Sequence, residues 1–314
     1  MKKVFLASLF SFYKEDSRDV KSAFSVPAFN LRLLAFDCAR ALFRAAQKVN
    51  TNVFIIEIAQ SEMGYTRQTP KSFARQCLAA AQAENYQGPI FLQGDHFKPK
   101  GNLKGLIKRS IKAGFFNIDI DCSALPLEQN IAKTNRFIDF IKDHRPDGVE
   151  MNIGAEVGEI GGSNTSPEYL RDFLQAVKGI TKVAVQTGTS HGRGGQIDWQ
   201  LLNNLSAIAK EHGLAGVVQH GASTLSEDDL RELPKHGVCE VHLATELQDV
   251  ILEHPLFPRE IKKKISLYQN KKEALGPLKK EIERIPQDVK DGIMKTLEDK
   301  FVFYFNCLGT AREE

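Results

Sequence analysis

Apolar, strand-like runs alternate with amphipathic, helix-like stretches along most of this 314-residue chain, which predicts an α/β fold. Eight such runs can be counted, and several are almost continuously apolar, as expected for parallel strands that are covered on both faces. Eight βα units fit a closed (β/α)8 TIM barrel better than an open doubly wound sheet. No GxGxxG or GxxxxGKS stretch supports a dinucleotide-binding or P-loop fold.

The strand-like runs are rich in β-branched and aromatic residues, as in NVFIIEI and PIFLQGD. The predicted strands are 24–30, 52–58, 89–95, 115–121, 148–154, 182–188, 215–221 and 239–245. Helical spacing of apolar residues places Cys38, Leu42 and Ala45 on one face of the first helix after a strand. The predicted helices are 33–49, 72–84, 103–113, 127–143, 167–177, 198–212 and 226–236.

The two ends of the chain fall outside this alternation. The start, MKKVFLASLF, has a short apolar run without a small-residue cleavage site, so it predicts a first amphipathic helix rather than an export signal. Residues 246–314 are charge-rich and helical. We expect a single barrel domain over 1–314, with 246–314 as a C-terminal helical extension on its surface. The apolar end FVFYFNCLG could also dock on a partner subunit.

Composition excludes several classes of protein. The chain is 42% apolar and 26% charged, which is ordinary for a globular protein. A net charge of +3, without basic runs interleaved with aromatics, predicts no nucleic-acid partner. No run is long enough to span a membrane, so no membrane partner is expected. The five cysteines are scattered, which favours a reducing, cytoplasmic location over a disulfide framework.

Metal-ligand residue types gather at the predicted strand ends, where barrels carry out chemistry. The third strand ends in Asp95-His96, and because neighbours on a strand face opposite ways, one could face a substrate while the other holds a metal. We interpret the imidazoles as ligands of a divalent metal with an open coordination position, typical of catalytic zinc. The expected ligands are His96, His191 and His220, with Asp121 and Glu156 as oxygen ligands or as partners that orient a histidine. Each of these residues taken alone could be structural.

The later strand ends also combine glycine with hydroxyl residues, in SHGRGG, HGAST and ATEL. Backbone N–H groups at such turns bind anions, and phosphate sites in barrels follow strands seven and eight. Ser223 and Thr245 would add hydroxyl donors. The alternative is that these are ordinary turns and helix caps.

The ordered motifs SVPAFNLRLL, GDH, IDIDCSALPLEQNI, GAEVGEIGG, GTSHG and HGAST, spread over residues 24–245, resemble the class II, metal-dependent fructose-bisphosphate aldolase family. This family includes the tagatose-bisphosphate aldolases. The resemblance implies a zinc-dependent lyase in a homodimer or homotetramer. It implies reversible aldol cleavage of a ketose bisphosphate, a step of carbohydrate metabolism such as glycolysis, to dihydroxyacetone phosphate and an aldehyde.

Residue by residue, the resemblance assigns the same zinc ligands, His96, His191 and His220. It matches Glu156 to a glutamate that can ligate displaced metal and Asp121 to the acid of a conserved turn. It makes Asp95 the general base that takes the substrate hydroxyl proton in cleavage. The implied phosphate-binding positions are Gly192, Gly221, Ser223 and Thr245.

Three departures from the family pattern bear on activity. In the loop after the fifth strand, IGGSNTSPEYL, the family's acid-bearing segment looks truncated and its proton-transfer glutamate absent, and the sequence leaves open whether Glu159 or Glu168 replaces it. The eighth strand has His242-Leu243-Ala244-Thr245 where the family has an Asn-x-Asp-Thr-like stretch, and HGAST replaces an HGGSG-like turn. His242 could be a fourth ligand, a proton donor or filler, and we favour filler or a substrate contact. The alternatives to an aldolase are a sugar-phosphate-binding accessory subunit and a metal-dependent barrel hydrolase.

Overall fold

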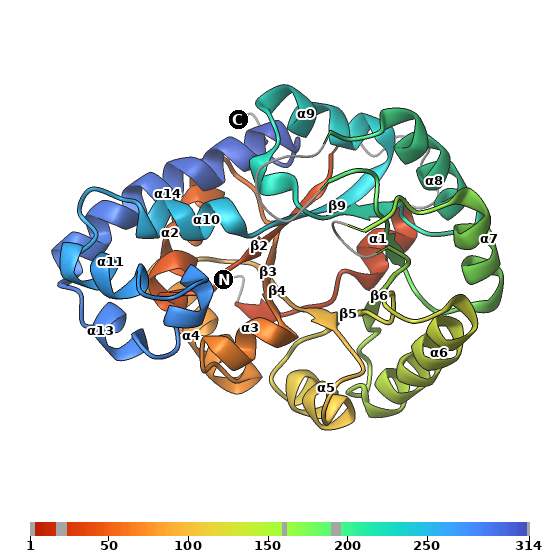
Figure 1. The fold of residues 1–314 in the computed structure, drawn as a ribbon, viewed down its shortest axis with the longest axis horizontal. Helices are drawn as coiled ribbons and strands as arrows, with labels where there is room; N and C mark the ends of the chain where they lie inside the picture. The colour runs from red at the N-terminus through yellow and green to blue at the C-terminus, as the bar shows by residue number, and fades with distance from the viewer. Residues whose placement is uncertain (1–3, 17–23, 159–161, 190–195, 313–314) are drawn as a thin grey trace.

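The computed structural model describes residues 4–16, 24–158, 162–189 and 196–312. Eight parallel strands close into a barrel with helices between them, and this confirms the predicted (β/α)8 fold (Figure 1). β4 pairs with β5, and β9 pairs with β2, so the sheet closes on itself. The barrel strands are β2 Val26–Asn30, β3 Ile55–Ala59, β4 Pro89–Phe97, β5 Asn117–Ile120, β6 Asn152–Glu156, β7 Lys182–Ala184, β8 Val217–Gln219 and β9 Val238–Leu243.

Helices cover the outside of this barrel (Figure 1). They are α2 Ala35–Lys48, α3 Gln60–Tyr65, α4 Pro70–Ala83, α5 Leu103–Lys112, α6 Leu127–His144, α7 Pro167–Ala176, α8 Trp199–Glu211 and α9 Glu227–Glu232, with short turns η1 Ala222–Thr224 and η2 Leu233–His236. The predicted strand 148–154 begins later, at Asn152, because Gly148 adopts a left-handed turn conformation at φ 74°. The predicted helix 226–236 is divided at η2, where Pro234 cannot donate a backbone hydrogen bond.

The N-terminal segment closes one end of the barrel. β1 Phe5–Leu6 pairs with the start of β4, and the helix begins only at α1 Phe10–Asp16. The prediction of a helix was therefore right for residues 10–16 and wrong for the strand before it. Leu9 and Tyr13 are buried in one apolar cluster with residues from the first half of the strands, such as Val26 and Ile55. This packing leaves the other end, with the strand C-termini, to carry the site.

The C-terminal helices pack on the barrel, as the sequence predicted. They are α10 Thr245–Leu252, α11 Arg259–Ile265, α12 Lys271–Ala274, α13 Lys279–Glu283 and α14 Gln287–Cys307. α14 lies along α2 (Figure 1), where Arg44 Nε is 2.8 Å from Glu298 Oε2. The ring of Phe301 meets that of Phe29 at 4.8 Å, and Phe305 meets Phe54 at 5.6 Å. Most of the apolar end of the chain, including Phe301 and Phe305, is thus buried against the barrel.

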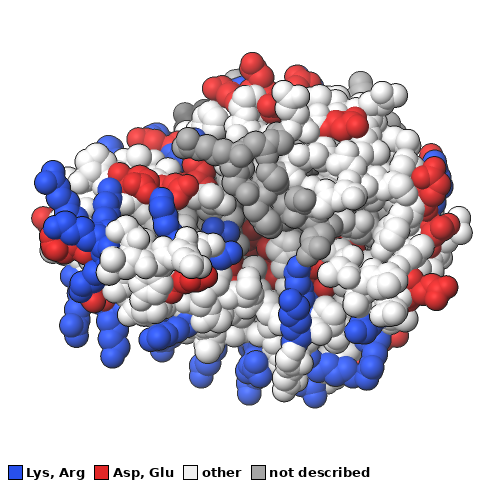
Figure 2. All heavy atoms as spheres, in the orientation of Figure 1, with Lys and Arg blue, Asp and Glu red and all other residues white. Residues whose placement is uncertain are grey.

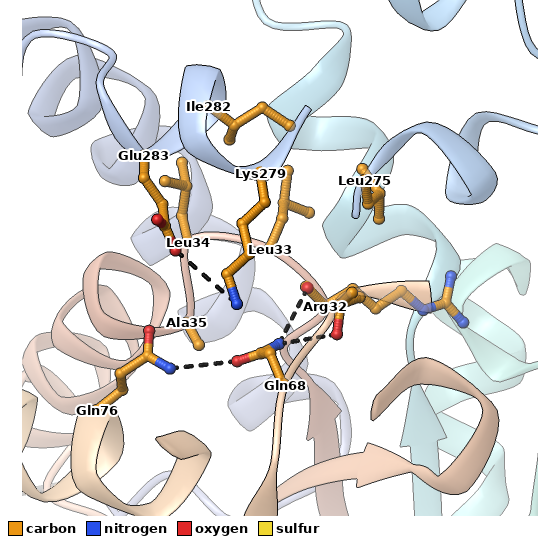
Figure 3. A pocket seen from close by; sticks show the side chains of 11 residues that line it. Arg32, Leu33, Leu34, Ala35, Gln68, Gln76, Leu275, Lys279, Ile282 and Glu283 are labelled. Carbon is orange, nitrogen blue, oxygen red and sulfur yellow. Dashed lines mark hydrogen bonds and ion pairs between the residues drawn. The ribbon is translucent and has the colours of Figure 1, made fainter. Parts of the chain in front are cut away.

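A small pocket separates α13 from the start of α2 (Figure 3). The Gln68 amide donates to the Arg32 carbonyl at 3.3 Å and accepts from Gln76 at 3.2 Å. Lys279 points across the pocket, 3.9 Å from Glu283, while the Arg32 side chain points away from it. Lys279 Nζ also donates to the Arg67 carbonyl at 3.1 Å, and this bond links α13 to the barrel side of the pocket.

Within the described ranges, every helix is too short or too polar to cross a bilayer. All five cysteines are buried as free thiols.

Candidate metal centre

The end of β4 is locally irregular, and this irregularity places two candidate residues together. The β4–β5 register shifts between Gly94 and Phe97, and His96 has φ 47°, a left-handed value that non-glycine residues rarely adopt. A Cβ at Gly94 would come within 2.4 Å of the Phe97 ring, so glycine is required there. The expectation that Asp95 and His96 face opposite ways was wrong. Both belong to one group of possible metal ligands at this irregular strand end.

That group contains Asp95, His96, Glu156 and His220, whose ligand atoms lie within 4.8 Å of one another. They come from the C-terminal ends of β4, β6 and β8. The rings of His96 and His220 stack with centroids 4.7 Å apart. Glu156 Oε1 is buried and lies 2.8 Å from His96 Nδ1. Two imidazoles and two buried carboxylates with their ligand atoms this close together fit a divalent metal such as zinc.

Asp121 lies behind His96 rather than in this group. His96 Nδ1 contacts Asp121 Oδ2 at 2.9 Å, and its Nε2 faces Asp95 Oδ2 at 3.8 Å. Asp121 also accepts from Ser123 at 2.6 Å and lies 3.1 Å from Lys98 Nζ. Glu156 Oε1 also lies 2.8 Å from Nδ1, so two carboxylates hold the ring on that side, and Nε2 is left facing Asp95.

Titration behaviour in this upper group follows burial and charge. Burial, together with the nearby Asp121 carboxylate, raises the pKa of Glu156 to about 8. Burial alone would lower the pKa of His96, but Asp95 and Glu156 raise it well above its usual value. For Asp95, burial opposes ionisation, yet His96 and His242 hold its pKa well below the usual range. In the absence of metal, the group therefore holds protons on Glu156 and His96 at neutral pH.

A second cluster of charged side chains fills the barrel just beneath. His242 Nε2 lies 2.7 Å from Glu240 Oε1, and its Nδ1 lies 3.3 Å from Glu57 Oε2 and 3.5 Å from Asp95 Oδ1. The His242 ring meets the His220 ring at 4.3 Å, so the two clusters touch. Burial alone would lower the pKa of His242, but Glu57 and Asp95 raise it well above its usual value.

Lys182 is the fixed cation of this lower cluster and is fully buried. It bonds to Asp119 at 3.0 Å and to the Gln93 amide oxygen at 2.8 Å, and it forms an ion pair with Glu240. Burial would lower its pKa, but the two carboxylates raise it above its usual value. A Cβ at Gly154 would come within 2.2 Å of Asp119, so the glycine leaves room for this pair. Burial raises the pKa of Asp119 to about 6 against the lowering effect of Lys182.

Of the predicted phosphate-binding residues, three are described. Gly221 has φ 68° and begins the turn η1, which contains the buried Ser223. Thr245 is the first residue of α10, whose N-terminus has no side-chain cap. α10 packs against η1, so these positions share one edge of the barrel mouth. His191 and Gly192 lie outside the described residues.

The loop after β6 is as short as the sequence indicated, because α7 already begins at Pro167, capped by Ser166. Glu168 is exposed in its first turn, and Glu159 lies outside the described residues. Figure 2 shows acidic atoms on the floor of a central hollow on the face drawn, with basic side chains at its rim.

The sequence interpretation missed Glu57, Lys182, Glu240 and Tyr13, whose hydroxyl donates to Glu240 at 2.5 Å. A signal for the three charged residues was present, because each interrupts an otherwise apolar strand. Tyr13 had no such signal, since its contact depends on how α1 packs under the barrel.

Comparison with known proteins agrees with this geometry. The pattern of the family described as fructose-bisphosphate aldolase class-II matches residues 18–301. Among solved structures, the YdjI aldolase from Escherichia coli K12 is 17% identical with a TM-score of 0.71, and 98% of each chain is covered. A fructose-bisphosphate aldolase from Campylobacter jejuni is 18% identical with a TM-score of 0.69, over 99% of this chain and 96% of that one. A putative fructose-1,6-bisphosphate aldolase from Coccidioides immitis is 19% identical with a TM-score of 0.67, over 96% and 95%. The chain belongs to the class II fructose-bisphosphate aldolase family.

Proposed function

We propose that this protein is a zinc-dependent aldolase that reversibly cleaves a ketose phosphate to dihydroxyacetone phosphate and an aldehyde. The observation that carries the proposal is the group Asp95, His96, Glu156 and His220 at the C-terminal ends of the strands. Family membership supports the reaction class, and the donor set supports the metal.

In this proposal His96 and His220 hold the zinc, together with His191, and Glu156 is an additional or alternative ligand. Asp121 orients His96 through its contact with Nδ1. A bound zinc supplies Lewis-acid stabilisation of the negative charge that develops when the carbon–carbon bond breaks.

Asp95 is the proposed general base. Its low pKa keeps the carboxylate ionised at neutral pH, and Oδ2 faces the same space as His96 Nε2. A carboxylate in that place accepts the substrate hydroxyl proton in cleavage and returns it in condensation. Ser223, Thr245 and the backbone around Gly221, together with Gly192, are the proposed contacts of the substrate phosphate.

A second candidate is a sugar-phosphate-binding subunit without turnover. The short loop before α7 favours it, because the longer acid-bearing segment that the family resemblance implies is truncated there. Both candidates predict a homodimer or homotetramer, which sedimentation analysis can test.

Two variants test the assignment of roles. We expect Asp95→Asn to retain at least one zinc ion per chain and to lose about 10²–10⁴-fold in cleavage rate, because proton transfer is lost while His96 and His220 remain. We expect His220→Ala to bind one ion fewer than wild type and to lose turnover. The matched control is Asp172→Asn, on the exposed face of α7.

Zinc content and single-turnover cleavage of a ketose bisphosphate are the measurements. A fully active Asp95→Asn variant would remove Asp95 as the base. Full zinc content in His220→Ala would remove His220 from the ligand set. Sugar-phosphate binding without turnover in the wild type would favour the accessory subunit.

A further inference from the structure

Three buried side chains from β3, β4 and β9 direct ligand atoms at one another below the first metal group. They are Glu57, Asp95 and His242, and none of their side chains is more than 5% exposed. His242 Nδ1 lies 3.3 Å from Glu57 Oε2 and 3.5 Å from Asp95 Oδ1, and the ligand atoms lie within 4.8 Å of one another.

Two of these atoms lack a hydrogen-bond partner. Asp95 Oδ1 and His242 Nδ1 are both fully enclosed and unsatisfied, although they face each other. Unpaired polar atoms in a protein interior are uncommon and costly. A cation bound between Glu57, Asp95 and His242 would give both atoms a partner.

The other side of the imidazole explains its orientation. His242 Nε2 contacts Glu240 Oε1 at 2.7 Å, and Glu240 is held in turn by Lys182 and by Tyr13. A carboxylate that accepts the Nε2 proton fixes the ring so that Nδ1 faces Glu57 and Asp95, where a bound cation would take the place of the Nδ1 proton. The same carboxylate–histidine arrangement orients metal-bound imidazoles generally.

We propose that Glu57, Asp95 and His242 form a second divalent-cation site next to the zinc site. Ligand atoms about 2.0–2.2 Å from a tetrahedral ion are about 3.3–3.6 Å apart, which matches the spacing around His242 Nδ1. The two oxygens of Asp95 face different residues: Oδ1 faces His242 in the proposed second site, and Oδ2 faces His96 in the zinc site. This site goes beyond the proposed function, which requires a single ion.

Metal counting tests the proposal without relying on activity. The full chain is stripped with a chelator, loaded with excess Zn²⁺, desalted and analysed for zinc per chain by plasma mass spectrometry. We expect two equivalents in wild type and in the control Glu211→Gln, an exposed residue at the end of α8. We expect one equivalent in Glu57→Gln, one in His242→Asn and one in His220→Ala, and none in Glu57→Gln combined with His220→Ala.

One equivalent in wild type would overturn the second site, and so would two equivalents in Glu57→Gln. Circular dichroism checks folding, and His242→Asn gives the same decision if Glu57→Gln fails to fold. Two equivalents without aldolase chemistry would contradict the proposed function alone. Aldolase chemistry with one equivalent would contradict the second site alone.

Discussion

The outer layer of the molecule is packed with aromatic side chains, whereas the centre of its barrel contains buried charged side chains. Where α14 packs on the barrel and α2, Phe29, Phe301 and Phe305 interlock edge to face, and charged pairs lie at the margin. In the centre, Glu57 and Lys182 are as deeply buried as these rings. Buried ion pairs seldom stabilise a fold more than apolar residues of the same shape do. We therefore infer that the outer layer raises the free energy of unfolding. The charged centre lowers it somewhat and serves binding and chemistry.

Removing the central cation should break this arrangement most severely. We expect Lys182→Met to lower the free energy of unfolding by about 3–5 kcal/mol, because Asp119 and Glu240 would lose their buried partner. Combining it with Glu240→Gln should restore part of that loss, since one unpaired charge is removed. Urea denaturation measures both. An unchanged unfolding free energy in Lys182→Met would show that the lysine does not balance this cluster.

The outer layer should respond to cavity formation. We expect Phe301→Ala to lower the free energy of unfolding by about 3–5 kcal/mol, because its ring is fully buried against Phe29. Bound zinc per folded chain should not change. Phe303→Ala on the same helix is the control and should cost less, because Phe303 is only partly buried. Equal losses in the two variants would argue against a close-packed α14 interface and against 1–314 folding as one unit.

Two buried carboxyl groups of the centre, Glu156 and Asp119, should make the metal-free protein less stable as pH rises. The pKa values of Glu156 and Asp119 are raised to about 8 and about 6 from ordinary values of 4.5 and 3.8. The folded state then binds more protons than the unfolded state, so the slope of stability with pH is negative. The stability that these two groups contribute should therefore fall steadily as pH rises from about 4 to about 8.

Denaturation at pH 5, 6.5 and 8 in the presence of a chelator measures this decline. Glu156→Gln should flatten it between pH 6 and 8, whereas Glu150→Gln, an exposed change, should not. A metal-free protein whose stability rises over this range would contradict the assignment.

Surface charge should matter least. Lys264 Nζ lies 2.7 Å from Glu281 Oε2, but the two side chains are 51% and 44% exposed. Solvent screening limits such pairs, so we expect Lys264→Gln to change the unfolding free energy by less than about 1 kcal/mol. A larger loss would mean that α11 and α13 depend on this pair.

The barrel was predictable from sequence because each strand is a local run of apolar residues. The spacing of apolar residues in these runs differs from the spacing in the helices. The ligand types at the strand ends were predictable for the same reason, since parallel strands bring their C-termini together. The relative orientation of Asp95 and His96 was not, because it depends on a bulge and a left-handed residue at one position. Regular alternation along a strand gave the wrong geometry there.

The lower cluster was also beyond the sequence interpretation. Glu57, Lys182 and Glu240 come from strands far apart in the chain, and only closure of the barrel brings them together. His242 was interpreted as filler or a substrate contact, yet it lies among carboxylates from several strands. A charged residue inside an apolar strand predicts a buried partner, but it does not identify the partner.

Proton exchange into dihydroxyacetone phosphate in D₂O, followed by NMR with and without a chelator, tests whether this protein is a metal-dependent aldolase. This half-reaction does not require the aldehyde to be known. We expect exchange by the zinc-loaded protein that a chelator abolishes and added zinc restores. No exchange by protein shown to contain zinc at His96 and His220 would contradict an aldolase function and leave sugar-phosphate binding as the role of the site.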